Sequence, residues 1–378
     1  MDVDISFVQY VASFLVVLSI VVFFHEWGHF LIARINGVRV DVFSIGFGRE
    51  VFGFTDKKTG TRWKFSLIPL GGYVKMFGDA DAASTKTDEK VEFTAEEKAV
   101  SFHHKKVGQR AAIVAAGPIA NFILAIILFT GVFMLVGRPT TESLVSEVVP
   151  GSAAEMAGVQ VGDLIVRVDD QAIERFADIQ RLVHLSNGEE LEIVVIRNGV
   201  EIELKAEPEM VEAEDNFGNE ITRPVLGIKA RSGEMESLGP VEAFGAAVHE
   251  TYTVTVSTLT ALGQMVTRSR SSDELGGPLR IAQFAGQAAE MGVVNFIMLT
   301  AILSVNLGLI NLFPVPLLDG GHLLFYGIEA VLGRPLGEKA QEYGFRVGLV
   351  LVFSLMIFST WNDLNYFKVV DFFKDLLS

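Results

Sequence analysis

The chain has 378 residues, of which 50% are hydrophobic and 20% are charged, and its formal net charge is −15. A mean hydropathy of +0.39 excludes a wholly soluble enzyme, a disordered chain and a collagen-like chain. The negative charge, together with the lack of a basic stripe interleaved with aromatic residues, argues against nucleic acid as a partner. No cysteine is present, which excludes disulfides, thiolate metal sites and cysteine nucleophiles.

Four apolar runs are expected to cross a bilayer, which takes about 20 residues of helix. They cover residues 5–24, 111–136, 293–313 and 347–358. The first run is not expected to be a cleaved signal peptide, because residues 1–4 carry two aspartates and no basic side chain, and no small-x-small site follows. The sequence therefore predicts a polytopic α-helical membrane protein with four transmembrane helices.

The charged residues divide unevenly between the segments that separate these runs. Residues 31–110 hold 14 basic and 10 acidic side chains, whereas residues 137–291 hold 12 basic and 26 acidic ones. Because positively charged loops stay on the cytoplasmic side, the first segment is expected inside and the second outside, with both termini outside. The expected segments are 1–36 (first span), 37–110 (inner segment), 111–137 (second span), 138–232 (outer domain), 233–291 (linker), 292–323 (third span) and 324–378 (fourth span and tail).

The inner segment begins with residues that favour strands. Runs rich in Val, Phe and Ile at Val40–Phe47 and Glu50–Phe54 are followed by a similar run at Trp63–Ile68, which predicts a β-hairpin or small sheet. Pro69 and the glycines after it are expected to end this element. The charged stretch from Gly78 to Lys98 has few large apolar residues and is expected to be a solvated loop.

The outer segment contains one compact β-rich domain. The run Gly-x-x-x-Gly-Asp-x-Ile from Gly158 to Ile165 and the strand Val225-Leu226-Gly227-Ile228 resemble a PDZ domain of the bacterial protease type. That resemblance implies that Val225, Leu226, Gly227 and Ile228 line a peptide-binding groove. The linker that follows is expected to be helical and to pack on the membrane surface.

A cluster of polar residues, His25-Glu26-Trp27-Gly28-His29, stands at the inner end of the first span. Residues four apart share one face of a helix, so His25 and His29 can bind one zinc ion while Glu26 reaches a water molecule there. A charged side chain at mid-bilayer costs roughly 2.5 to 3.5 kcal/mol. A shared metal accounts for the spacing, whereas a helix end that merely faces headgroups does not.

A catalytic zinc ion needs a third protein ligand and one open position. Without cysteine, that ligand must be His, Asp or Glu, and the candidate is Asp319 at the inner end of the third span. Two prolines and two glycines between Asn311 and His322 must break the helix there, and broken helices at membrane depth survive only where protein or a water-filled cavity covers them. Since the first and third spans both run inward, the two motifs fall on the same side and can meet.

The His-Glu-x-x-His motif, the later Asn-x-x-Pro-x-Pro-x-x-Asp-Gly motif and the single PDZ-like domain between them resemble the site-2 protease family, specifically its bacterial regulator-of-sigma-E protease branch. The resemblance implies a Zn²⁺ ion bound by His25, His29 and Asp319. It also implies that Glu26 is the general base and that Asn311 holds the substrate backbone or the oxyanion. The best-studied members carry two PDZ domains in tandem, whereas this chain carries one, so a size-exclusion role that needs the pair is in doubt.

The same resemblance assigns the inner β-element to a membrane-associated substrate-binding role. Trp63, Phe65 and Leu67 are expected to bind an unwound substrate by strand addition, because a peptide bond inside a helix is closed to attack. The expected fold is thus four transmembrane helices, a cytoplasmic-side membrane-associated β-hairpin or sheet and one external PDZ domain. Asn121, in the second span, is expected to serve packing, with a bond across helices or a contact with substrate as the alternatives.

The functional hypothesis is an intramembrane zinc endopeptidase in the bacterial inner membrane, with the PDZ domain and both termini in the periplasm. Its expected partners are the lipid bilayer and single-span membrane-protein substrates cut near the cytoplasmic face, such as anti-sigma factors and remnant signal peptides. The alternative is a catalytically idle membrane scaffold that presents a PDZ peptide-binding domain. A metal transporter is disfavoured because the four spans contain no inverted repeat.

Overall fold

The computed structural model describes residues 5–78, 93–139, 141–214, 220–231, 235–267 and 270–369. Within these ranges the chain forms two compact units, which are described separately. One unit holds residues 1–131, 244–255 and 275–378, and the other holds residues 132–243 and 256–274. The predicted loop from Gly78 to Lys98 lies mostly outside the described residues, and its end forms a short helix, α2 (Ala95–Val100).

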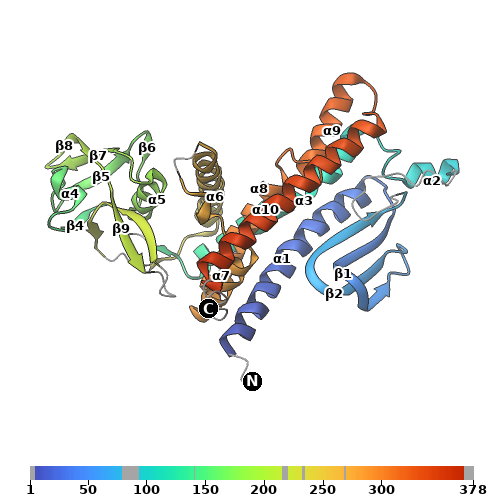
Figure 1. The fold of residues 1–378 in the computed structure, drawn as a ribbon, viewed down its shortest axis with the longest axis horizontal. Coiled ribbons are helices and arrows are strands. Elements are labelled where there is room, and N and C mark those ends of the chain that lie inside the picture. Colours follow the sequence, from blue (N-terminus) through green and yellow to red (C-terminus); the bar gives the residue numbers. More distant parts are fainter. Residues whose placement is uncertain are drawn as a thin grey trace, which may run out of the picture. The chain divides into compact units, whose positions relative to one another are not determined.

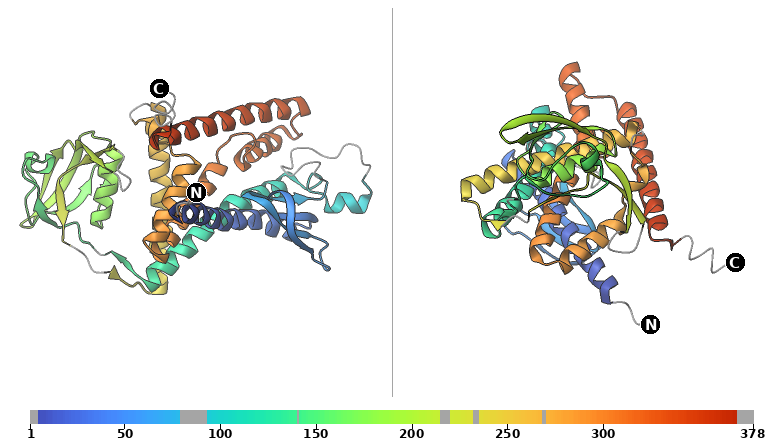
Figure 2. Two further views of the ribbon diagram at one scale, coloured as in Figure 1. Left: turned by 60° about the horizontal axis from the view of Figure 1, so that its bottom comes forward. Right: turned by 90° about the vertical axis from the view of Figure 1, so that its left-hand side faces the viewer.

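Four helices of the described chain are long and apolar enough to cross a membrane. They are α1 (Ile5–Ile35), α3 (Val107–Leu135), α8 (Val293–Asn311) and α10 (Glu338–Tyr366). This number agrees with the four apolar runs in the sequence. The fourth helix extends past its predicted apolar run at both ends, and α1 and α10 run in opposite directions along roughly parallel axes (Figures 1 and 2).

A shorter helix, α7 (Pro278–Glu290), packs along the first half of α1 and also contacts α8 and α10. Gly286 lies directly against the ring of Tyr10, so α7 and α1 approach closely at a position without a side chain. The buried carboxylate of Asp363 in α10 accepts hydrogen bonds from the backbone N–H groups of Gly277 and Leu279 at the start of α7. These contacts stabilise the first turn of α7, whose N–H groups have no partners within the helix.

The inner β-element is a folded sheet made from two long strands, β1 (Val40–Thr55) and β2 (Arg62–Met76). Phe43 pairs with Trp63 on one side and with Val74 on the other, and Trp63 in turn pairs with Phe54. The sheet therefore has four segments in the order 72–76, 40–45, 62–66 and 50–55. The prediction that Pro69 ends the element was wrong.

The sheet continues past Pro69 because the chain reverses there. Proline cannot donate to a strand ladder, and Gly71 adopts a φ of +139°, which only glycine takes readily. The following residues then pair with the free side of the first segment. This last segment, Gly72–Met76, is one of the two edges of the sheet, and it packs against α1 (Figure 1).

The expected third span, residues 292–323, is divided in two. Helix α8 ends at Asn311, and a separate helix, α9 (Asp319–Leu332), begins at Asp319. Between them Leu317 has a φ of +108°, a conformation that costs a non-glycine residue of order 1–3 kcal/mol. The two prolines break the helix, as the sequence predicted, but the chain then resumes as a new helix rather than as the end of the old one.

The second unit is β-rich. It contains a four-stranded sheet in the order β6-β5-β7-β8, the pairs β4–β11, β9–β10 and β3–β12, and the helices α4 (Ala153–Met156) and α5 (Phe176–Ser186). The strands are β3 (Arg138–Pro139), β4 (Val145–Val148), β5 (Leu164–Val168), β6 (Gln171–Ala172), β7 (Leu191–Arg197), β8 (Val200–Ala206), β9 (Glu209–Glu214), β10 (Glu220–Val225), β11 (Ile228–Ala230) and β12 (Met235–Glu236).

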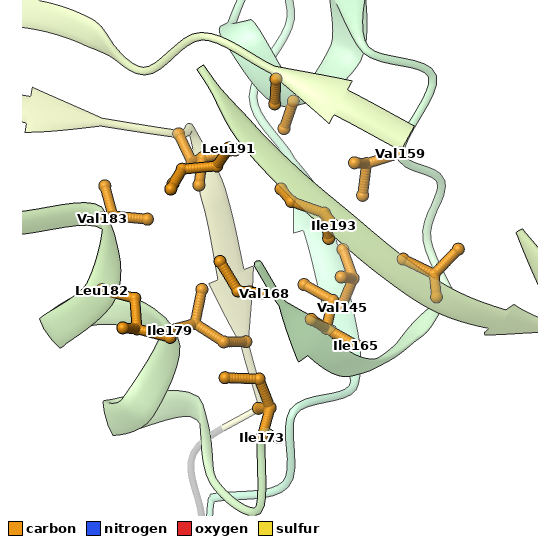
Figure 3. Packing of buried hydrophobic residues seen from close by; sticks show 14 residues of the cluster. Val145, Val159, Ile165, Val168, Ile173, Ile179, Leu182, Val183, Leu191 and Ile193 are labelled. Atoms are coloured by element: carbon orange, nitrogen blue, oxygen red, sulfur yellow. The ribbon is translucent and has the colours of Figure 1, made fainter. Parts of the chain in front are cut away.

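The core of this unit lies between the four-stranded sheet and α5 (Figure 3). Ile165, Val168 and Ile193 are fully buried, and Ile179 and Leu182 of α5 cover them. The alternation along β8 reflects the period of two that a half-buried strand requires, whereas three successive residues of the central strand β7 are buried. A 28-residue helix, α6 (Pro240–Thr267), follows the unit.

Candidate metal centre

Three potential ligand atoms from two distant parts of the chain converge inside the helical unit. The Nε2 atoms of His25 and His29 are 3.2 Å apart. The Oδ2 atom of Asp319 lies 3.2 Å from the first of these nitrogens and 3.5 Å from the second. Tetrahedral zinc with ligand bonds of about 2.0–2.1 Å requires ligand atoms about 3.3–3.4 Å apart, so the spacing of the three atoms fits this ion.

The surroundings of the three atoms also fit a metal. His25 and His29 are 8% and 9% exposed. Among the described residues, Asp319 Oδ2 is buried and makes no hydrogen bond. A carboxylate oxygen buried without a hydrogen bond is costly unless a cation balances it. Two imidazole nitrogens and one carboxylate oxygen are a typical ligand set for catalytic zinc, with one position left for water.

The backbone of α3 lies directly beneath the two imidazoles. A side chain at Gly117 would place its Cβ 2.5 Å from His29 Cε1 and 3.0 Å from His25 Cε1, and closer still to His29 Nε2. On the α1 side, a Cβ at Gly28 would meet the backbone of Ala116 and lie 2.7 Å from the Cβ of Ala120. The helices touch at two glycines, which is why the His-Glu-x-x-His segment can sit on α3.

The orientation of His29 is set by a carbonyl group of α3. Its Nδ1 lies 2.9 Å from the backbone oxygen of Ile113 and donates to it, which leaves the Nε2 lone pair for a metal. Metal-binding histidines almost always donate their other ring N–H in this way, and the partner raises the basicity of the ligand.

Asp319 owes its position to the break between α8 and α9. It is the first residue of α9, and the two glycines that follow are packed against the backbone of the break. A Cβ at Gly320 would overlap the carbonyl groups of Leu312 and Phe313, and one at Gly321 would lie 2.6 Å from Pro316 Cα. The Asp-Gly-Gly sequence is therefore required for the start of α9 to fold back on the segment before it.

Glu26 lies between this centre and the sheet. Its carboxylate interacts electrostatically with the three potential ligands and accepts a hydrogen bond from the backbone N–H of Val74. A Cβ at Gly72 would lie 3.1 Å from Glu26 Cγ. The edge segment of the sheet thus borders the carboxylate.

Comparison with known proteins gives the family. A family model described as peptidase family M50 matches residues 13–355. The chain belongs to peptidase family M50. Among curated relatives, a candidate zinc metalloprotease of Agrobacterium fabrum is 47% identical to this chain. The match covers 94% of this chain and 96% of the relative. Another candidate zinc metalloprotease, from Rhizobium meliloti, is 44% identical with the same coverage, and the metalloprotease MmpA of Caulobacter vibrioides is 37% identical over 99% of this chain and 100% of its own.

The M50 peptidase is thus a zinc metalloprotease of the site-2 type, an inner-membrane protein, and Zn²⁺ is its cofactor. These findings confirm the predicted family, enzyme class and metal. The solved PDZ domain of an SdrC-like protein from Listeria innocua matches 25% of the chain and 99% of its own length at 22% identity, with a TM-score of 0.20.

The remaining predicted site residues are not among the three potential metal ligands. Asn311 is the last residue of α8 and half-buried, and within the described chain it makes no hydrogen bond to the three potential ligands. Trp63 is half-buried and stacks on Phe43, whereas Phe65 and Leu67 are exposed.

The predicted groove residues of the β-rich unit follow β10. Val225 ends β10, Ile228 begins β11 and Gly227 lies between them with a φ of +79°. Leu226 is only 3% exposed and its side chain belongs to the core, so it could contribute to a groove only through its backbone. Alternation along the segment could not show this, because the turn at Gly227 interrupts the strand.

Sequence reasoning did not assign the residues that support the centre. These are Ile113, Gly117 and Asn121 of α3, together with Gly72 and Val74 of the sheet edge. A glycine before Pro118 in the second span was a visible signal, since glycine within a helix is unfavourable unless a close approach requires it. Nothing in the pattern showed which group approaches it.

Proposed function

We propose that this M50 peptidase cuts single-span membrane proteins near the cytoplasmic face, with zinc held by His25, His29 and Asp319. The observation that carries the proposal is the convergence of the three ligand atoms at 3.2–3.5 Å, from α1 and from the start of α9, next to the carboxylate of Glu26. A site placed among apolar helices favours substrates that are themselves in the membrane. Anti-sigma factors and remnant signal peptides are the substrate classes to test first.

Different residues of the chain are assigned different steps of peptide hydrolysis. A zinc ion at this centre supplies Lewis-acid activation of water and of the scissile carbonyl. Glu26 takes one proton from the attacking water as the new C–O bond forms, and it delivers that proton to the leaving nitrogen as the C–N bond breaks. Asn311 is the candidate donor to the substrate backbone or the oxyanion.

Substrate pairing is assigned to the sheet edge at Gly72–Met76. The segment Arg62–Ser66, which contains Trp63 and Phe65, has partners on both sides, so its backbone groups cannot accept another strand. The outer side of Gly72–Met76 instead faces Glu26. A substrate strand added there would bring an extended peptide bond beside the general base. Trp63, Phe65 and Leu67 are therefore retained only as side chains that shape the sheet and its membrane contact.

The sheet carries an apolar surface suited to lipid. Phe52, Phe54, Phe65 and Leu67 are 62%, 52%, 46% and 66% exposed. Monomeric proteins rarely expose such a group of large apolar side chains unless it meets a membrane or another protein. This supports a membrane-associated sheet on the cytoplasmic side.

Charge and α6 both bear on the proposed membrane orientation. The inner segment has the excess of basic residues, which supports a periplasmic position for the β-rich unit and both termini. Val241, Phe244, Val248 and Tyr252 are all exposed and recur at helical spacing along α6. That stripe supports the expected position of the linker on the outer membrane surface.

The β-rich unit is assigned as a PDZ-like domain that docks or filters substrates. Helix α5 lies beside β10, and β11 pairs with β4 on one side. A peptide groove would run between α5 and the segment from β10 to β11, with Val225, Gly227 and Ile228 at its rim. The backbone of the buried Leu226, rather than its side chain, would contribute.

The decisive experiment compares wild type with Glu26→Gln. Glutamine keeps the size of the side chain but cannot accept the proton, so cleavage of a co-expressed single-span substrate should fall by about 10²–10⁴-fold. Zinc content, measured on the purified protein, should stay at the wild-type level. Cleavage that persists in the variant would contradict the role of Glu26, and a wild-type protein without hydrolytic activity would favour the idle scaffold.

A further inference from the structure

We propose that Asn121 is a positioning residue for the zinc ligand His25: its side-chain carbonyl oxygen accepts the Nδ1–H of His25 and thereby presents Nε2 to the metal. Asn121 lies in α3 and is fully buried. Its amide group is 3.3 Å from His25 Nδ1, on the far side of the ring from the atom that faces Asp319. The proposal rests on the zinc site assigned above.

The protonation of the ring decides which end of the amide is needed. A neutral imidazole carries one proton, so a metal on Nε2 leaves that proton on Nδ1, which must then donate. In the structure the amide nitrogen of Asn121 faces Nδ1, and its Oδ1 has no partner among the described residues. The two ends of an amide are assigned from their hydrogen bonds rather than seen directly. A half-turn of the amide removes the clash between donors and gives the proton an acceptor.

The arrangement repeats the one that holds His29. There the Nδ1–H donates to the carbonyl of Ile113, also in α3. Ile113, Gly117 and Asn121 succeed one another at intervals of four, so they share one face of the helix. The bare backbone at Gly117 lies under both rings, and an acceptor flanks each end. One face of α3 thus orients both histidines.

Asn121 is itself held firmly by α8. Its backbone carbonyl accepts a hydrogen bond from Ser304 Oγ at 2.8 Å. A Cβ at Gly308 would lie 3.2 Å from the Asn121 Cβ, so the two helices are in close contact here. A histidine that binds a metal needs a rigidly held acceptor, because the affinity of the site for zinc depends on the orientation of the imidazole ring as well as on the ligand atom.

The test measures zinc affinity in the full-length purified protein by competition with a chelator. Asn121→Leu keeps the volume but removes the acceptor, and it should weaken zinc binding by about 10- to 100-fold. Asn121→Asp keeps an acceptor oxygen and should bind within about threefold of wild type. With Co²⁺ in place of zinc, the visible absorption of Asn121→Leu should differ from that of wild type, and that of Asn121→Asp should not.

Two controls separate the possible failures. Gly131→Ala adds a methyl group to the same helix where nothing lies within 4 Å, and it should bind zinc like wild type. His25→Ala should lose tight binding; if it does not, the assigned zinc site itself fails. If His25→Ala loses zinc while Asn121→Leu keeps wild-type affinity, only the role of Asn121 is overturned. Equal losses in Asn121→Leu and Asn121→Asp would show a packing role and overturn it as well.

Discussion

Replacing Gly117 by alanine should disable the metal centre through a single methyl group. The added Cβ would lie 2.5 Å from His29 Cε1, whereas ordinary contact begins at 3.4 Å, so the ring must move by about 0.9 Å. Zinc–ligand distances are held to about ±0.2 Å. The required movement is several times larger, so zinc affinity should fall by at least about 100-fold, or about 2.8 kcal/mol.

The same helix supplies a matched control. A methyl group at Gly131 meets nothing within 4 Å, and Gly131→Ala should leave zinc affinity unchanged. Both changes favour the helix by about 1 kcal/mol from propensity alone, so a loss confined to Gly117→Ala must come from the contact with the rings. The assay is chelator competition on both purified variants, with thermal unfolding as a check on folding. Wild-type zinc affinity in Gly117→Ala would refute the geometry argued here.

Two further predictions concern the general base and the β-rich unit. Gly72→Ala puts a methyl group 3.1 Å from Glu26 Cγ and 2.8 Å from the Ser44 carbonyl oxygen. Because this displaces the general base, kcat should drop by about tenfold or more. The zinc content should stay unchanged, and a loss of zinc would contradict this explanation. In the β-rich unit, burial raises the pKa of the Asp163 carboxyl, but hydrogen bonds from Arg197 and the Gln160 N–H outweigh it and leave the pKa below 3.8. The stabilisation is therefore complete above 3.8 and is lost as the pH falls below it. In thermal unfolding of the full chain, the midpoint temperature of the transition should fall as the pH is lowered through this range. Asp163→Asn should remove this dependence of the midpoint on pH.

The local sequence pattern was sufficient to predict the features that depend on residues close together in the chain. Spans are recognised by length and apolarity, because a bilayer requires about 20 apolar residues of helix. His25 and His29 share a face because four residues make about one turn. Asp319 was chosen from the proline- and glycine-broken motif that contains it, with the number of crossings between the motifs as a check, and the structure places its oxygen 3.2 Å from His25 Nε2.

The fold of the inner β-element could not be predicted from the local sequence pattern. Strand-forming residues marked the segment, yet the proline and glycines were interpreted as an end rather than as a reversal. Which segment becomes the edge depends on pairing partners some 30 residues apart, and no period within one strand reports them. The same reason explains why the pattern did not show that the Leu226 side chain is buried.

The sequence by itself determined that this protein has four helices long and apolar enough to cross a membrane, belongs with zinc peptidases and carries its candidate ligands on two motifs, because each of these follows from residues that are close in the chain. Tertiary structure alone decided what supports those ligands. Ile113 meets His29 across 84 residues of chain and Asn121 meets His25 across 96, and Gly72 meets Glu26 only because the sheet folds back on α1. Contacts of that separation are set by helix packing and strand pairing, which a one-dimensional pattern does not contain.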